Sequence, residues 1–386
     1  MPDTQEETRK YNGLLRKEST LPRDAYVDRD QYERELERIW YRNWIYVGRS
    51  DELEGPKSFR VFELGSQQVL ILRDEESRLQ AFHNTCRHRG SLLMEEKSGC
   101  LRGSLITCGY HRWAYDLQGN LQKIPSRNPQ PDFSKADYPL YPVAIQDWNG
   151  FLFIHLSPEE AAPIEESFGE SSRLENWPLA DLQVAHTYQK TLDCNWKIFW
   201  ENFSECLHCP NIHPELSRVV PLYKQNFMEV HDDPDWEEHQ GEGNKLFKPG
   251  LAEGMESWSP DGSRCADPFP DLTPEEVANG HNYCETIPSA FIVGHVDYVR
   301  AVRVLPLGPE KTDIHALWLF SPEAMKKADF DPSQTIEFGK RVIDQDGRVS
   351  ELNQGGLRSI RHKEGVLMPE EYYVHAFHEW VRSHFD

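Results

Sequence analysis

Two histidines five residues apart, His208 and His213, are well suited to metal chemistry in the second half of the chain. They lie in an aromatic and apolar stretch, residues 195–214, which also contains Glu205. Imidazole binds iron, zinc, copper and nickel alike, so this pair indicates a metal site without naming the metal. Because Pro210 has no backbone N–H, we expect a helix to end near His208 and His213 to follow the break.

A second group of potential ligands lies far upstream. It reads C-x-H at Cys86 and His88, and C-x-x-H at Cys108 and His111. Two thiolates and two imidazoles can hold tetrahedral zinc, or a Rieske [2Fe–2S] cluster in which the cysteines bind one iron and the histidines the other. Zinc fingers usually place both cysteines before both histidines, whereas each half here supplies one of each. The spacing therefore favours the Rieske cluster.

The composition excludes some classes of binding partner and indicates the cell compartment. A formal net charge of −22 argues against nucleic acid and against an anionic membrane surface. The amino-terminal residues have no basic start and no apolar core, and no apolar run approaches the ~20 residues of a membrane helix. We therefore expect a cytoplasmic protein. In a reducing cytosol, the cysteines outside the C-x-H and C-x-x-H motifs should be reduced thiols: Cys100, Cys194, Cys206, Cys209, Cys265 and Cys284.

The elements that must position these groups follow from hydrophobic periodicity. Short alternating segments over residues 44–156 predict an antiparallel β domain. Helical spacing appears near residues 29–40, and residues 185–192 predict a strand that enters the helix carrying His208. We expect an α+β protein in three parts: a helical segment over 1–43 that packs on the catalytic domain, the β domain over 44–156, and the catalytic domain over 157–386. The last part contains an irregular insertion at about 223–280, then strands over 283–320 and helices over 333–361 and 369–385.

The two metal motifs, in this order, resemble the Rieske non-haem iron oxygenases, specifically their catalytic (α) subunit. The resemblance covers the chain from about residue 40 onward. It is carried by the C-x-H and C-x-x-H motifs and by Asn195-Trp196-Lys197 followed by E-x-x-H-x4-H, which starts at Glu205. It implies a Rieske domain followed by a helix-grip (START-type) catalytic domain. The implied cofactors are a [2Fe–2S] Rieske cluster and a mononuclear Fe(II).

The resemblance also implies roles for acidic residues. Matching the family's late acidic helix makes Asp346 the third iron ligand, with Asp344 and Glu351 as alternatives. Glu205 stands where the family usually has an aspartate that links a Rieske histidine of a neighbouring subunit to a mononuclear-iron ligand. We expect it to share a helical face with His208 and to keep the bridging role. Asn202, one turn earlier, either orients a ligand or is an ordinary polar helix residue.

The sequence has no motif for binding the nucleotide cofactor that would supply electrons. It shows no GxGxxG fingerprint and no Walker-type loop. We therefore expect a separate NAD(P)H-dependent flavin and iron–sulfur reductase, with or without a ferredoxin, to supply electrons for the reaction with O2. If electrons pass between subunits, as the resemblance implies, a head-to-tail homotrimer follows.

The substrate is the least defined part of this interpretation. The E-C-x-H-C form resembles the carnitine monooxygenase branch, which implies hydroxylation of a small quaternary ammonium compound, with N-demethylation or C–N cleavage as variants. Cation–π contacts from an aromatic cage would bind the ammonium. Alternatives are a ring-hydroxylating dioxygenase acting on an aromatic compound and, more remotely, a Rieske electron carrier without oxygenase activity or a zinc hydrolase. The candidate cage residues are Trp200, Trp236, Trp258, Tyr283, Phe291, Tyr298 and Trp318.

Overall fold

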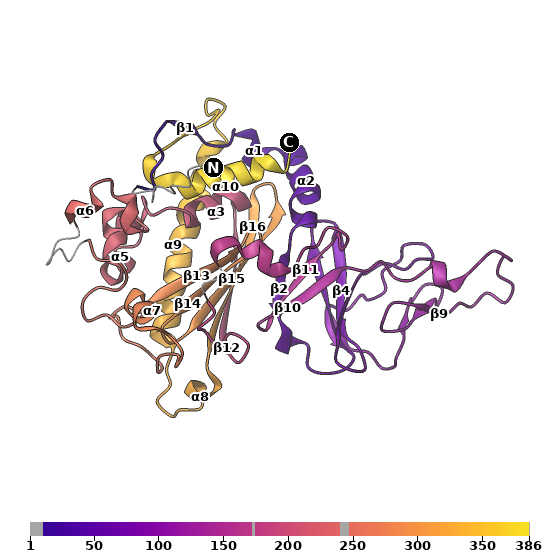
Figure 1. Cartoon of the computed structure of the whole chain (residues 1–386). Helices are drawn as coiled ribbons and strands as arrows, with labels where there is room; N and C mark the ends of the chain where they lie inside the picture. The colour runs from indigo at the N-terminus through magenta and orange to yellow at the C-terminus, as the bar shows by residue number, and fades with distance from the viewer. Residues whose placement is uncertain (1–10, 172–173, 240–246, 386) are drawn as a thin grey trace, which may run out of the picture. The chain divides into compact units, whose positions relative to one another are not determined.

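The computed structural model describes residues 11–171, 174–239 and 247–385, arranged as two compact units (Figure 1). The larger unit comprises Met1–Glu35, Glu170–Glu285 and Phe291–Asp386, and the smaller comprises Leu36–Gly169 and Thr286–Ala290. Helices and antiparallel sheets are both present, so the predicted α+β class is confirmed. The amino-terminal residues on which we judged the absence of a signal sequence lie outside the described residues. No helix in the described part has the length and apolar character to cross a membrane.

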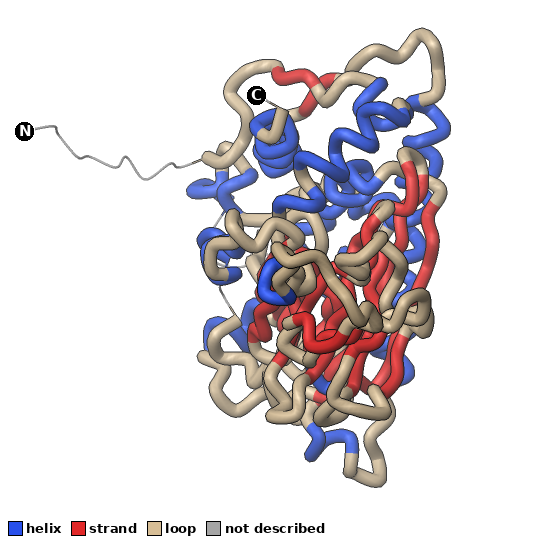
Figure 2. Tube along the Cα trace, turned by 90° about the vertical axis from the view of Figure 1, so that its right-hand side faces the viewer, coloured by secondary structure: helices blue, strands red, loops and turns tan. Residues whose placement is uncertain are grey.

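The smaller unit is built from short strands joined by loops; across the chain, strands are drawn red and loops tan in Figure 2. Its sheets have the orders β5-β4-β3-β6, β10-β11-β2 and β7-β8-β9. Neighbouring strands are antiparallel, as the alternating sequence pattern predicts. The strands are β2 (Ile45–Arg49), β3 (Ser58–Leu64), β4 (Gln67–Arg73), β5 (Leu79–His83), β6 (Ser98–Cys100), β7 (Ile106–Thr107), β8 (Ala114–Tyr115), β9 (Leu121–Lys123), β10 (Ala144–Trp148) and β11 (Phe151–His155). Short 3₁₀ turns are η1 (Trp40–Arg42), η2 (Ser50–Glu52), η3 (Lys135–Asp137) and η4 (Ile164–Ser171).

The larger unit centres on a five-stranded sheet of order β12-β16-β15-β14-β13. Its strands are β12 (Gln183–Leu192), β13 (His281–Thr286), β14 (Ala290–His295), β15 (Val299–Gly308) and β16 (Lys311–Phe320). The β12–β16 and β15–β16 pairs are antiparallel. β14 and most of β15 are buried along their length, so this half of the sheet is core on both faces.

A long helix, α9 (Ser333–Leu357), packs against this sheet. Its buried side recurs every three or four residues, as expected for a helix with one face on the core. Two glycines permit the close approach. A Cβ at Gly339 would lie 2.9 Å from the Trp318 side chain, and one at Gly347 would lie 2.6 Å from that of Leu192. The position of Gly347 fixes how near its neighbour Asp346 lies to the strands.

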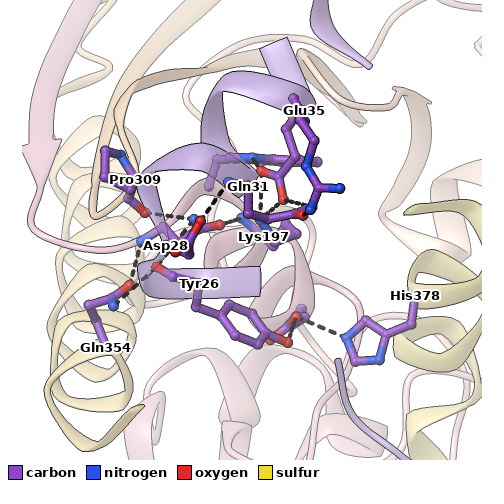
Figure 3. A network of polar contacts seen from close by, with 12 residues as sticks. Tyr26, Asp28, Gln31, Glu35, Lys197, Pro309, Gln354 and His378 are labelled. Atoms are coloured by element: carbon purple, nitrogen blue, oxygen red, sulfur yellow. Dashed lines mark hydrogen bonds and ion pairs between the residues drawn. The ribbon is translucent and has the colours of Figure 1, made fainter. Parts of the chain in front are cut away.

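The strand predicted before the central helix is present, and β12 leads into α3 (Trp196–Phe203). Asn195 caps this helix: its side-chain oxygen accepts a hydrogen bond from the backbone N–H of Lys197 at 3.0 Å. The Asn195 side-chain amide donates to the Pro309 carbonyl at 2.6 Å, and its backbone N–H donates to Gln354 on α9 at 2.8 Å. The start of α3 is therefore tied to both the sheet connection and α9 (Figure 3).

Lys197 and Glu35 form a fully buried ion pair at this point (Figure 3). Nζ of Lys197 lies 2.7 Å from both carboxylate oxygens of Glu35. The indole N–H of Trp196 donates to the same carboxylate at 2.9 Å, and Gln31 donates to it at 3.1 Å. Burial lowers the pKa of Lys197, and the attraction of Glu35 opposes that shift. The amino-terminal helix α2 (Arg29–Arg38) is thereby joined to α3 through charge as well as packing.

The remaining elements of the larger unit are short, apart from the carboxy-terminal helix α10 (Tyr372–Ser383). The other elements are β1 (Glu18–Ser19), α1 (Asp24–Val27), α4 (Cys209–Ile212), α5 (Leu216–Val219), η5 (Pro221–Gln225), η6 (Val230–Asp232), α6 (Trp236–His239), α7 (Pro274–Asn279), α8 (Pro322–Met325), β17 (Val366–Leu367) and η7 (Pro369–Glu371). The segment 223–280, expected to be irregular, contains the end of η5, together with η6, α6 and α7, between irregular stretches, and its residues 240–246 lie outside the described part.

The buried pair makes a stability prediction. Glu35→Gln should lower the free energy of unfolding by about 3–5 kcal/mol, because the Lys197 ammonium is left buried without its counter-charge. Adding Lys197→Met should restore much of that loss, since the double variant buries no charge. Differential scanning calorimetry of the single and double variants measures both effects.

The matched control is Glu160→Gln, which breaks the pair between Arg42 and Glu160, whose side chains are 52% and 43% exposed. A change below about 1 kcal/mol is expected there, because water screens exposed pairs. Equal losses for the single and double variants would show that the pair itself does not hold α3.

Candidate metal centres and active site

His208, His213 and Asp346 each place a potential ligand atom within 4.8 Å of the others. Nε2 of His213 lies 2.7 Å from Oδ1 of Asp346, and Nε2 of His208 lies 3.4 Å from the same oxygen. In the described part of the chain, no other group of three such side chains has its ligand atoms so close together. Two imidazoles and one carboxylate form the facial set that holds non-haem Fe(II) with open positions.

The second nitrogen of each imidazole has its own acceptor. Nδ1 of His208 lies 2.6 Å from Oε1 of Glu205, and Nδ1 of His213 lies 2.8 Å from Oε1 of Gln345. A histidine that donates from Nδ1 presents Nε2 as the lone-pair atom, and metal-binding histidines usually have such an outer partner. Both Nε2 atoms face Asp346. The donor set thus fits a metal ion bound by two Nε2 atoms and one carboxylate.

The local structure around the histidines differs from our prediction. Helix α3 ends at Phe203, five residues before His208, and Pro210 does not break a helix. Pro210 lies instead in the first turn of the short helix α4, where its missing N–H costs no hydrogen bond. His208 precedes this helix and His213 follows it. The two rings approach with centroids 5.2 Å apart because a single short helix separates them.

The prediction that Glu205 shares a helical face with His208 is wrong, although the two side chains do meet. Glu205 lies in the loop after α3, where its carboxylate accepts hydrogen bonds from the backbone N–H groups of Leu207 and His208. The loop itself aims the carboxylate at the imidazole. Asn202, near the end of α3, has its side-chain nitrogen 3.4 Å from the His208 ring, which is within reach of an orienting contact.

Asp346 lies on the buried face of α9, and the two alternative ligands do not join the trio. Asp344 accepts hydrogen bonds from Tyr188 at 2.7 Å and from Lys190 at 2.6 Å. Glu351 accepts from the backbone N–H of Asp193 at 3.2 Å. Both are engaged with the edge strand β12 and the residue that follows it, so α9 presents Asp346 to the histidines.

The three ligand candidates are strongly coupled electrostatically. Burial disfavours a charge on His208, but its contacts with Asp346 and Glu205 prevail and raise its pKa to about 10. Burial likewise opposes ionisation of Asp346, yet hydrogen bonds from His208 and His213 lower its pKa to about 2. The site thus holds the Asp346 carboxylate in its charged form and favours positive charge beside it, as a site for a divalent cation must.

Two cysteines beside the site form a disulfide, which corrects the prediction that they are free thiols. Cys206 and Cys209 are joined with Cα atoms 4.9 Å apart. Their burial and their position at the turn into α4 bring the sulfur atoms together, a local geometry that compartment and cysteine number do not reveal. The bridge encloses Leu207 and His208. Of the six cysteines predicted to be reduced thiols, the other four are free: Cys100, Cys194, Cys265 and Cys284.

The upstream motifs form two loops with the same turn in the smaller unit. In the first, the N–H of Gly90 donates to the Cys86 carbonyl at 2.9 Å, and in the second, the N–H of Arg112 donates to the Cys108 carbonyl at 3.0 Å. Gly90 and Arg112 both have positive φ, +77° and +57°. Four-residue spacing and a left-handed residue therefore recur in both loops.

These loops present a buried pair of thiols and a more exposed pair of imidazoles. Cys86 and Cys108 are 3% and 1% exposed, and burial together with their proximity raises the pKa of Cys86. His88 is exposed and His111 partly so, with ring centroids 4.7 Å apart. Trp113 stacks on the His88 ring. A binuclear iron cluster with cysteines on the inner iron and histidines on the outer iron fits this separation.

Comparison with known proteins identifies the family. The chain matches the family described as "Ring hydroxylating alpha subunit (catalytic domain)" over residues 179–386, more than half its length. Residues 43–139 match the "Rieske [2Fe-2S] domain". The chain is a Rieske non-haem iron oxygenase α subunit. Such an oxygenase is an oxidoreductase that holds a Rieske cluster and a mononuclear iron and receives electrons from a reductase. Because the catalytic domain is present, the electron-carrier alternative is excluded.

Its relatives share the whole architecture. The chain is 27% identical to the glycine betaine monooxygenase oxygenase subunit of Chromohalobacter salexigens, over 94% of this chain and 84% of the relative. It is 26% identical to the chloroplastic choline monooxygenase of Spinacia oleracea, over 94% and 78%. The quaternary ammonium Rieske monooxygenase CntA with L-carnitine is a structural match at TM-score 0.69 and 23% identity, over 95% and 96%. Naphthalene 1,2-dioxygenase from Rhodococcus sp. matches at the same TM-score, with 19% identity over 95% and 94%. This likeness confirms the predicted fold.

In this Rieske oxygenase a small cavity of about 80 Å³ lies beside the proposed iron ligands. A bound water needs roughly 10–15 Å³ on such a scale, so the cavity suits a compact ligand. Trp258, Tyr283 and Phe291, three of the seven predicted cage residues, line it, whereas Trp200, Trp236, Tyr298 and Trp318 do not. The complete lining is Phe199, Asn202, Phe203, Glu205, Cys206, His208, Cys209, His213, Leu216, Tyr223, Met228, Trp258, Tyr283, Phe291, Arg300, Val342, Ile343 and Asp346.

Sequence reasoning missed several residues of the site. Gln345 contacts His213 directly, and its side-chain amide donates a hydrogen bond to Glu215 at 3.3 Å. Glu215 therefore helps to orient His213 through Gln345. Nothing in the local pattern marks them, although Gln345 does directly precede the predicted ligand Asp346. Arg300 was not singled out either, because a lone arginine in a strand has no motif around it.

Two substitutions should separate the two centres. His208→Ala should remove the mononuclear iron but leave the Rieske electron paramagnetic resonance signal of the dithionite-reduced protein, because His208 is in the other unit from the cluster loops. Cys108→Ser should do the reverse and abolish that signal. Iron content per chain and the spectrum of each variant measure both. His362→Ala and Cys100→Ser are the matched controls and should leave iron and spectrum unchanged. Loss of the Rieske signal in His208→Ala would contradict the separate assignment.

Proposed function

We propose that this oxygenase hydroxylates a small quaternary ammonium compound. The single observation that carries the proposal is the aromatic cavity beside His208, His213 and Asp346. The ring of Phe203 stacks on Phe291 at 4.0 Å, and Tyr283 meets Phe203 edge-on at 5.9 Å. Ring faces attract a methylated ammonium, which carries positive charge but offers no hydrogen-bond donor. The relatives named for glycine betaine, choline and carnitine support this substrate class.

The metal centres would supply the redox chemistry. Two electrons and two protons accompany each O2, so that one oxygen atom enters a C–H bond of the substrate and the other leaves as water. The electrons come from NAD(P)H through a separate reductase. The chain's own residues bind and orient the substrate: the aromatic walls exclude water and offer ring faces to the ammonium. When the hydroxylated carbon is an N-methyl group, the product releases formaldehyde and leaves a tertiary amine.

The ligand assignments form part of this proposal. Cys86, Cys108, His88 and His111 would hold the [2Fe–2S] cluster, and His208, His213 and Asp346 the mononuclear iron. We assign residues 44–156 to the Rieske domain, 157–386 to the catalytic domain, and 1–43 to a segment packing on the latter. The buried contacts of Tyr26 and Glu35 with α3 support that packing.

The assembly and location are also proposed. Glu205 would pass electrons from a Rieske histidine of a neighbouring subunit to His208, which it contacts at 2.6 Å. That path requires a head-to-tail ring, for which a homotrimer is the simplest closed form. This arrangement is supported by similarity to a quaternary ammonium Rieske monooxygenase structure that is described as giving insights into inter-subunit electron transfer. We further propose a cytoplasmic location.

The substrate proposal is tested by coupled turnover. Purified oxygenase with a reductase and NADH should consume O2 when given glycine betaine, carnitine or choline, and should release formaldehyde where an N-methyl group is attacked. Naphthalene and benzoate test the ring-hydroxylating alternative and should give no diol. Oxygen uptake and product analysis by mass spectrometry measure the outcome. Diol formation without oxidation of any ammonium compound would replace the proposal by that alternative.

The bridging role of Glu205 makes a separate prediction. Glu205→Gln should retain both iron centres but slow the oxidation of the reduced Rieske cluster by O2 and substrate by roughly 10- to 100-fold, because the amide cannot accept the His208 proton as a carboxylate does. Single-turnover absorbance of the cluster measures this rate. The matched control is Glu364→Gln, an exposed acid away from both centres. A normal rate in Glu205→Gln would remove the bridge from the proposal.

A further inference from the structure

Arg300 is a buried cation on β15 whose side chain lines the active-site cavity. It is 6% exposed, and its Nε has no hydrogen-bond partner. Within the described residues, no carboxylate lies within ion-pair distance of its guanidinium. Burying an arginine without an anion is costly, so an arginine kept in this state needs a reason.

The other buried arginines of the described chain show how unusual this is. Arg303, three residues further along β15, lies 3.8 Å from the carboxylate of Asp313. Arg49 lies 4.0 Å from that of Asp51 and donates to the Asn149 carbonyl. Both therefore have an acid nearby. Arg300 differs from them in facing the cavity.

The groups on which the charge of Arg300 acts are tyrosines and histidines. Its positive charge acts on Tyr223, Tyr283 and Tyr298, and on His281 and His295. Burial, with a smaller contribution from Arg300, lowers the pKa of His281 to about 4 and also lowers the pKa of His295. At neutral pH these imidazoles carry no charge, and the tyrosine hydroxyls stay protonated. These tyrosines and histidines can donate or accept hydrogen bonds but do not form an ion pair with the guanidinium.

Other polar atoms near Arg300 also lack partners. Nε1 of Trp258, Nδ1 of His281 and both ring nitrogens of His295 are buried without a hydrogen bond. The Trp258 ring lies against both imidazoles, with centroids 4.7 Å and 5.0 Å away. Trp258 lines the cavity with Arg300. Unsatisfied donors gathered beside a buried cation are the arrangement that binds an anionic, hydrogen-bond-accepting group.

We propose that Arg300 binds a carboxylate of the substrate, so that the substrate is a compact zwitterion rather than a simple cation. The inference rests on the proposed function and names its substrate class more closely. The cavity offers two different surfaces to a ligand: the ring faces of Phe203, Tyr283 and Phe291, and the cationic side chain of Arg300 on β15. A short ammonium carboxylate would place its N-methyl groups against the ring faces and its carboxylate at the arginine. Arg300 is thus a specificity-determining residue.

The test uses four ligands that separate the two charges. Glycine betaine carries both the trimethylammonium and the carboxylate, and choline carries the ammonium alone. In 3,3-dimethylbutanoate the carboxylate remains but an uncharged tert-butyl group replaces the ammonium, and 3,3-dimethylbutan-1-ol carries neither charge. Calorimetric titration of the iron-loaded oxygenase without reductase measures the affinity of each, for the unaltered protein and for Arg300→Gln, Arg300→Lys and the exposed control Arg218→Gln.

We expect Arg300→Gln to weaken binding of the two carboxylates by roughly 10- to 100-fold, as for a lost charged hydrogen-bond pair, and to change the two alcohols by less than about 2-fold. Arg300→Lys, which keeps the charge but not the planar fork, should lie between, and Arg218→Gln should match the unaltered protein. In turnover, KM for glycine betaine should rise while kcat for choline is retained. The melting temperature of Arg300→Gln should be unchanged or higher, because an unpaired buried charge has been removed.

Equal losses for all four ligands, or a lower melting temperature with loss of all binding, would show a structural role and overturn the inference. So would carboxylates that bind no better than their alcohol counterparts. Failure of the proposed function gives a different pattern. If neither ammonium ligand is bound or oxidised while 3,3-dimethylbutanoate still depends on Arg300, the carboxylate assignment stands and the ammonium class is wrong.

Discussion

The buried ion pair between Lys197 and Glu35 fixes the helix on which the mononuclear centre depends. Helix α3 is held at its start by this pair and by Asn195, whose backbone N–H donates to Gln354 of α9. The same α9 carries Asp346, eight residues before Gln354. The loop after α3 brings His208 to that carboxylate. His208 and Asp346 are far apart in the sequence but meet because the start of α3 is hydrogen-bonded to α9.

This anchoring allows the ligand loop itself to be irregular. Residues 204–208 have no repeating hydrogen bonds, yet Glu205 ties two backbone N–H groups and the His208 ring to one side chain. The Cys206–Cys209 bridge closes the same turn covalently. Each constraint is short-range and acts on a segment whose two ends are already held. A loop so restrained can present an imidazole with little loss of entropy on metal binding.

The sequence predicted the parts whose chemistry demands particular residue types at short spacing. The Cys and His motifs, the two-histidine segment and the acidic helix belong to this class, and the strand before α3 and the α9 periodicity follow from hydrophobic pattern. The roles of Gln345, Glu215 and Arg300 could not be predicted in this way, because tertiary contacts bring their partners from distant parts of the sequence. Pro210 misled the helix prediction, since a proline serves equally to end a helix or to begin one.

The fold does not decide the substrate. CntA and naphthalene 1,2-dioxygenase match this chain with the same TM-score, although one is named for a quaternary ammonium and the other for an aromatic hydrocarbon. Aromatic walls would suit either. A hydrocarbon, however, gives a buried guanidinium nothing to bind, and covering Arg300 with it would leave the charge both dehydrated and unpaired. A carboxylate removes that penalty as it enters. The arginine thus discriminates through the cost of the wrong ligand as much as through the contacts of the right one.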